Sequence, residues 1–96
     1  MFSGIISKRS EKIVASAATI EANADILVVT GTAAIANIIP RTYGIASQRV
    51  TLIPLAAATL ANTGNIAAAV VLVVGRAQDI VYSKSQNKWY PVIAAV

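Results

Sequence analysis

Apolar and polar positions alternate with a period of two along the first third of the chain, and this period is typical of a half-buried β-strand. The alternation runs from Ile13 to Thr19 and continues from Ile20 to Ile26. Alanine is frequent here, so Ala15–Ala24 would also fit a helix on propensity alone. The period of two favours strands instead. Short segments rich in valine, isoleucine and threonine, separated by glycine, proline and asparagine, extend this pattern and predict an all-β domain.

The rest of the chain divides into apolar segments that end at residues known to interrupt strands. Gly31 marks a turn or bulge, Pro40 has no N–H to donate to a neighbouring strand, and the sequence Asn-Thr-Gly-Asn at 62–65 is a strong turn signal. The predicted strands are Ile26–Thr30, Thr32–Ile39, Gln48–Leu60, Val70–Val74, and the arms Asp79–Ser83 and Lys88–Val92 of a final hairpin.

The stretch Ala67–Gly75 consists of eight aliphatic residues and then a glycine. Its valine-rich part, Val70–Val74, shows no alternation, and a strand that is apolar on both faces needs cover on both. The chain is also 56% hydrophobic and only 12% charged, which is more apolar material than one small core hides. The sequence therefore predicts self-association, with another copy covering the second face of this strand.

The residues that usually carry catalysis are scarce. The chain has no cysteine and no histidine, which removes thiolate chemistry, the most common general base and the most common neutral metal ligand. The acids are Glu11, Glu21, Asp25 and Asp79, and their spacing does not form a recognisable carboxylate pair. We therefore expect neither an enzyme nor a cofactor or metal.

The net charge of +4 raises the question of nucleic acid, whose binding proteins cluster basic residues among aromatic ones. Here the only basic cluster is Lys8-Arg9 with Lys12. We interpret the charges as solvated groups that keep an apolar protein soluble; attraction to an acidic protein surface is an intermediate alternative. The apolar runs fall far short of the roughly 20 residues of a membrane-spanning helix. The N-terminal residues have the wrong order for a secretory signal. We expect a soluble, unprocessed chain without nucleic-acid or membrane partners.

The first twelve residues differ in composition from the rest of the chain. They place an apolar tip, with Phe2, Ile5 and Ile6, before the basic cluster. One interpretation is a frayed terminus. The other is an extended N-terminal arm, residues 1–12, that docks on a neighbouring protein and precedes a β domain of residues 13–96. The single tryptophan, Trp89, is interpreted as a core or interface anchor rather than a ligand-stacking ring.

The order of several short blocks resembles a β-rich module of tailed-bacteriophage virion proteins. The blocks are Val29-Thr30-Gly31-Thr32 with Ile35 and Ile38, Gln48–Leu52, Asn62–Ile66, and Lys88-Trp89-Tyr90. Together they span Asp25–Val92. The chain departs from the module at Gly44–Ser47, where a glycine-rich approach is usual, and alanine replaces many of its threonines.

This resemblance implies a homotrimer with a small β-sandwich or barrel-like domain. Such modules occur as capsid decoration (cement) proteins and at the ends of tail fibres, and a chain of 96 residues with its own Met1 suits the first. We therefore expect a structural virion protein, made in the host cytoplasm, that binds major capsid proteins on the outer capsid surface. The alternative is a tail-fibre or spike module that binds a host glycan through exposed aromatic residues such as Tyr43 near Arg41, Tyr82 or Tyr90. The residues expected to contact the capsid are Phe2, Ile5, Ile6, Lys8, Arg9 and Lys12. Those expected in the core or trimer seam are Val70, Leu72, Val74 and Trp89.

Overall fold

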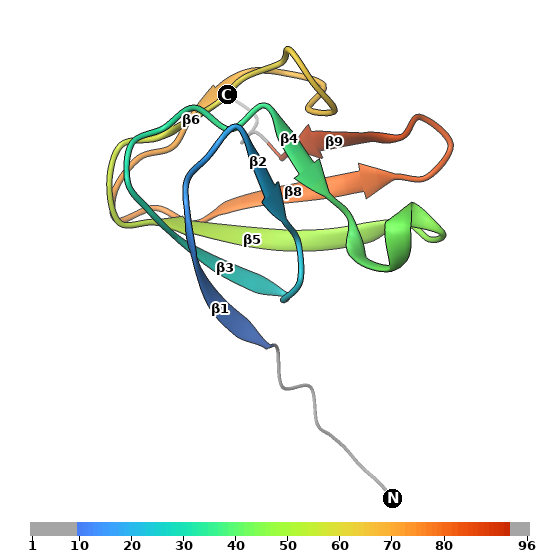
Figure 1. The fold of residues 1–96 in the computed structure, drawn as a ribbon, viewed down its shortest axis with the longest axis horizontal. Coiled ribbons are helices and arrows are strands. Elements are labelled where there is room, and N and C mark those ends of the chain that lie inside the picture. The colour runs from blue at the N-terminus through green and yellow to red at the C-terminus, as the bar shows by residue number, and fades with distance from the viewer. Residues whose placement is uncertain (1–9, 93–96) are drawn as a thin grey trace, which may run out of the picture.

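Nine β-strands and one short 3-10 helix make up the described part of the chain (Figure 1). A computed structural model describes residues 10–92, except for the side chain of Tyr43. The elements are β1 (Glu11–Ala15), β2 (Thr19–Glu21), β3 (Ile26–Thr30), β4 (Asn37–Ile39), the 3-10 helix η1 (Arg41–Gly44), β5 (Gln48–Pro54), β6 (Thr59–Leu60), β7 (Val70–Val71), β8 (Gln78–Ser83) and β9 (Lys88–Pro91). The all-β prediction is confirmed.

The strands form one large sheet and two small ones. The large sheet has the order β1-β3-β5-β8-β9, and the small sheets pair β2 with β4 and β6 with β7. Strands β1, β3 and β5 run parallel, whereas β8 and β9 are antiparallel additions at the far edge. The large sheet is therefore mixed.

The parallel part arises because the chain winds between two sheets. Between β1 and β3 it passes through β2, and between β3 and β5 it passes through β4, which lies parallel to β2. A parallel bridge between Ile35 and Leu60 extends the second layer toward β6. Parallel neighbours need long crossover connections, and here strands of the smaller sheet supply them. In Figure 1, β2 and β4 lie side by side in front of the large sheet, with β4 close to β8 and β9.

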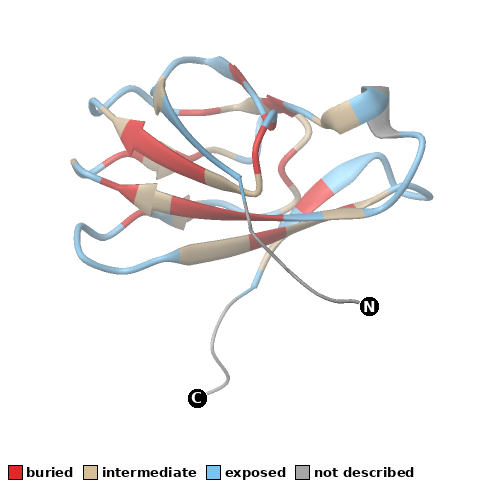
Figure 2. Ribbon diagram, turned by 90° about the horizontal axis from the view of Figure 1, so that it is seen from below, coloured by how far each residue is buried: buried red, intermediate tan, exposed pale blue. Residues whose placement is uncertain are grey.

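The core lies between these layers, and Figure 2 shows buried segments along the strands and exposed ones in many of the loops. Alternate residues of the large sheet enter one cluster, including Leu27 and Val29 of β3 and Leu52 of β5. Trp89 of β9 is fully buried and packs on Tyr82, with ring centroids 5.2 Å apart. Residues from all three sheets therefore share a single apolar interior.

Several predicted strands are confirmed. Ile26–Thr30 is β3, and the arms of the final hairpin match β8 and β9 to within one residue. Pro40 ends β4, and residues 62–63 form the predicted turn. Gly31 follows β3 in a bend with φ of +79°, a backbone conformation that glycine adopts without steric cost.

Two predicted strands and the predicted N-terminal arm were too long. The segment Thr32–Ile39 is extended only at β4, because its first half crosses from one sheet to the other and bonds to the chain around Ser16 and Ala18. The segment from Gln48 stops at Pro54 and resumes only as β6. At the N-terminus, β1 begins at Glu11, so the last two residues assigned to the arm belong to the large sheet.

The prediction for Val70–Val74 is also wrong in part. Only Val70–Val71 form a strand, and a turn follows at Val74-Gly75. Although the sequence shows no alternation, the structure has it, because Leu72 is buried whereas Val71 and Val73 are exposed. The chain itself thus covers one side of this segment and leaves the other open.

Candidate interaction surface

An apolar segment that contains β7, here called the valine loop (residues 69–76), carries three of the exposed large hydrophobic residues between 10 and 92. β7 is anchored on β6 by the pairs Thr59–Val71 and Leu60–Val70. The backbone N–H of Leu72 then donates to the carbonyl of Ala58 at 2.9 Å. These bonds fix the parity of the segment and turn Leu72 inward.

Because Leu72 points into the core, its neighbours point away from it. Val71 is 67% exposed, and Val73 and Val74 are also about half exposed. Val71 and Val73, together with Val70, Arg76 and Val92, border a shallow hollow of about 440 Å³. Full burial of one valine side chain is worth roughly 1.5–3 kcal/mol, so a partner that covers the valine loop gains appreciable binding free energy.

The four residues predicted for the core or trimer seam differ in how far they are buried. Leu72 and Trp89 are fully buried, and Val70 is half-buried against the core. The indole N–H of Trp89 donates to the carbonyl of Ile38 at 2.9 Å. Among the four, Val74 is the one with an exposed side chain. Sequence reasoning missed Val71 and Val73, and the signal for them was the parity set by a buried Leu72.

Most of the predicted capsid-contact residues, namely Phe2, Ile5, Ile6, Lys8 and Arg9, lie outside the described residues. The sixth, Lys12, is exposed on β1 at the edge of the large sheet. Of the six, the structure thus places only Lys12.

The point where residues 1–9 join the domain is tied down by Ser10 and Asp25. The backbone N–H of Ser10 donates to the Asp25 carboxylate at 3.0 Å, and the Asp25 N–H donates to Ser10 Oγ at 3.0 Å. The carboxylate also pairs with Arg41 at 3.0 Å. The pKa of Asp25 lies below its ordinary value, mainly because the carboxylate accepts the hydrogen bond of the Ser10 N–H. Desolvation raises this pKa, and the positive charge of Arg41 lowers it further. The exit of the N-terminal residues is therefore fixed by ionic hydrogen bonds.

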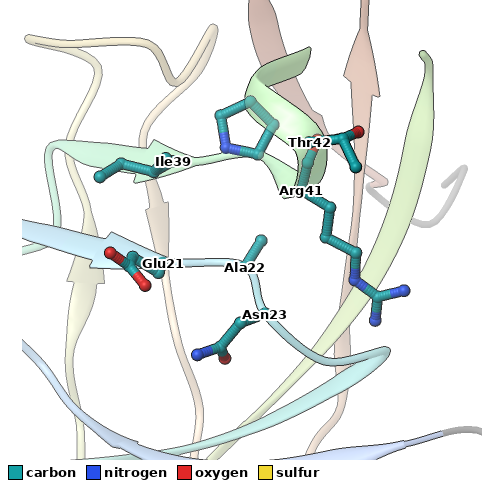
Figure 3. Close-up of a pocket in the computed structure, with 7 residues that line it drawn as sticks. Glu21, Ala22, Asn23, Ile39, Arg41 and Thr42 are labelled. Atoms are coloured by element: carbon teal, nitrogen blue, oxygen red, sulfur yellow. The ribbon is translucent and has the colours of Figure 1, made fainter. Parts of the chain in front are cut away.

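A second hollow, of about 350 Å³, opens between β2, β4 and η1 (Figure 3). Glu21 and Ile39 line one side, Arg41 and Thr42 line the other, and Asn23 closes one end. Arg41 is already engaged with Asp25. The hollow thus combines the Glu21 carboxylate with neutral groups and with an arginine that is already ion-paired, and this set contains no nucleophile with a base beside it.

The aromatic residues considered for glycan stacking are placed differently from one another. Tyr82 is buried against Trp89, and its hydroxyl is 3.2 Å from Asn87 Oδ1. Tyr90 is 41% exposed on β9. The backbone of Tyr43 is in η1, and its side chain lies outside what the structure describes. Tyr82 therefore offers no ring to a sugar.

The acids of residues 10–92 are dispersed rather than clustered. Asp79 bonds to Arg49, at 2.7 Å, and to the hydroxyl of Thr51 on the large sheet. Across the described range, no group of three His, Cys, Asp or Glu side chains is arranged to hold a metal ion. No helix in that range has the length and apolar character to cross a membrane. Comparison with protein-family models, curated proteins and solved structures found no match to this chain.

Proposed function

We propose that this protein is a structural virion protein that binds the outer surface of a tailed-phage capsid as a homotrimer, with a small sandwich-like β domain, and stabilises contacts between major capsid proteins. The observation that carries the proposal is the valine loop, whose valine side chains are exposed because Leu72 between them points into the core. Apolar surface of this kind on a small protein marks an interaction site. The resemblance of the blocks between Asp25 and Val92 to virion modules supplies the class of partner.

The proposed mechanism is thermodynamic linkage. A protein that binds only the assembled shell shifts the assembly equilibrium toward the shell, by an amount set by its concentration relative to its dissociation constant. A trimer presents three copies of the same contact, so binding of the first raises the effective concentration of the others. Weak individual contacts then give a stable decoration without a catalytic or ligand-binding site.

In this proposal two parts of the chain divide the work. Residues 1–9, with Phe2, Ile5 and Ile6, contact the capsid, and the β domain associates with its copies. The clamp of Ser10 on Asp25 supports this division, because it fixes where the contacting segment leaves the domain. A flexible junction would lose more conformational entropy on binding.

The test uses capsids of the phage that encodes the chain, prepared without this protein. The full chain should pellet with the capsids, and a variant lacking residues 1–9 should stay in the supernatant while keeping its oligomeric state. Removal of residues 93–96 is the matched control and should leave pelleting unchanged. If the variant lacking residues 1–9 pellets normally, the arm is not the contact. If the full chain does not pellet, the capsid function is wrong.

A further inference from the structure

The large sheet has a second face, turned away from the core, that carries at least one apolar side chain on every strand. We call it the outer face. Register places Ile13 of β1, Val28 of β3 and Ile53 of β5 side by side in one row. Val81 of β8 and Tyr90 of β9 form a second row beside Arg49. Of the residues named here, Ile13 is the most open, with 73% of its side chain exposed.

Strand parity shows that these side chains share the outer face. In β3, Leu27 and Val29 belong to the core cluster. Because side chains alternate along a strand, Ile26 and Val28 point to the outer face. β3 is thus the strand that is apolar on both sides. The sequence predicted that Val70–Val74 is the strand with two apolar faces. In the structure that strand is β3, in the middle of the parallel part of the sheet.

The charges on the outer face cancel. By the same parity it carries Glu11 and Asp79, which are acidic, and Arg49 and Lys88, which are basic, giving (+2) + (−2) = 0. Arg49 and Asp79 are paired with each other at 2.7 Å. The whole chain carries +4, so its excess positive charge lies elsewhere. Two copies therefore meet with the least repulsion through this face, whereas an acidic partner would be drawn to the other surfaces.

The extent of the surface also matters. Five strands about 4.8 Å apart and about 17 Å long offer roughly 400 Å² per copy, about half of the roughly 800 Å² per partner of a standard interface. The outer face does not end at the last strand, however. Val92 bonds through its N–H to Asp79 and also lines the hollow of the valine loop with Val71 and Val73. The outer face and the valine loop therefore meet at Val92, and the loop extends the apolar surface beyond the edge of the sheet.

We propose that the outer face of the large sheet, continued by the valine loop, packs against a second copy of this chain. This inference rests on the self-association in the proposed function and names the surface that each copy turns toward its neighbours around the axis of the trimer. Sheet-on-sheet packing buries the open side chains of Ile13 and Tyr90 and completes the cover of Ile26 and Val28. The central Arg49–Asp79 pair stays satisfied within each copy.

The test measures sedimentation equilibrium of the full chain without any capsid, so it is independent of the decoration experiment. The variant combines Ile13→Glu and Tyr90→Glu, both at positions already open to solvent in one chain. It should need about tenfold or more higher protein concentration to associate, because burying unpaired charge is unfavourable. The control is Ile45→Glu, at a loop isoleucine that is 68% exposed outside the sheet, and it should associate like the natural chain.

A second readout keeps the test valid if the double variant folds poorly. The chain has no cysteine, so Tyr90→Cys and Ile45→Cys each carry a single reporter thiol. When the chain is associated, maleimide labelling of the first should slow about tenfold and labelling of the second should not. A monomeric natural chain, an unchanged double variant, or equal labelling at both positions would overturn the inference. So would association that appears only after residues 1–9 are removed, because that segment would then cover the face.

Discussion

Replacement of Asn65 by alanine tests whether this side chain takes the place of a neighbouring strand by forming hydrogen bonds with the backbone of β4. The Asn65 amide accepts a hydrogen bond from the Ile38 N–H at 2.8 Å and donates one to the Ile38 carbonyl at 2.7 Å. Its own backbone carbonyl accepts the N–H of Trp89 at 2.8 Å. Asn65 therefore joins β4 to β9 at the buried tryptophan.

The structure gives the expected size of the effect. In Asn65→Ala the buried Ile38 N–H loses its acceptor, which costs about 1–3 kcal/mol. The Ile38 carbonyl keeps the indole donor of Trp89, so its loss is limited to about 0.5–1.5 kcal/mol. The free energy of unfolding should therefore fall by about 1.5–4.5 kcal/mol. Domains of this size are stable by only about 5–15 kcal/mol, so the variant should fold but unfold at much lower denaturant.

Urea unfolding followed by fluorescence measures this directly, because Trp89 is the only tryptophan and is fully buried. The midpoint should fall by about 1–2 M for a small domain. Asn62→Ala makes the same chemical change in the same turn at an exposed position, and should stay within about 0.5 kcal/mol of the natural chain. All samples need one protein concentration, since self-association adds to apparent stability. Equal midpoints for the two variants would refute the proposed role of Asn65.

Five further substitutions have definite expectations. Gly64→Ala places a methyl group against a neighbouring backbone carbonyl, and it should lower the free energy of unfolding by about 1–3 kcal/mol, as urea unfolding would measure. Gly75→Ala changes a residue with φ of +88° that has open space around it, so backbone strain alone should lower the free energy of unfolding by about 1–2 kcal/mol. The folded-state pKa of Asp25 is below its ordinary value of 3.8; the stability from this group is therefore present above about pH 4 and lost as pH falls through the folded pKa. Asp25→Asn should flatten the acid decline in melting temperature, and an unchanged profile would argue against the Ser10 clamp. Leu72→Asp should abolish folding, whereas Val71→Asp should leave a folded chain that associates less, as circular dichroism and sedimentation would report.

The sequence predicted the elements whose signals are local. The strand Ile26–Thr30 and the final hairpin carry dense β-branched or aromatic residues between clear turn residues, so their bounds were nearly right. The partners of the strands were not predictable in this way, because parallel pairing of β1, β3 and β5 depends on contacts between distant segments. The same holds for Asn65, which the sequence marks only as part of a turn.

The apolar surplus was recognised from composition, but its location depended on parity. In Val70–Val74 nearly every residue is a valine, so the sequence does not show which side faces the core. The burial of Leu72 shows which side faces the core, and the core of the same chain therefore covers that side of the segment. In β3 the opposite occurs, since both sets of alternating residues are apolar and only Leu27 and Val29 meet the core. A sequence that is apolar on both faces therefore indicates a shared surface without saying which strand provides it.

The winding of the chain explains why the surplus gathers on the large sheet. Because each parallel crossover runs through a strand of the smaller sheet, all of the second layer lies on one side of β3 and β5. Within residues 10–92 no element is placed over the other side, yet Val28 there is nearly buried by its neighbours Ile13 and Ile53. Lateral contact between strands thus protects the middle of the face, and Ile13 at the edge stays open. An interface built on such a face gains most from burial at its rim, which is why the proposed test places its charges at Ile13 and Tyr90 rather than at the centre.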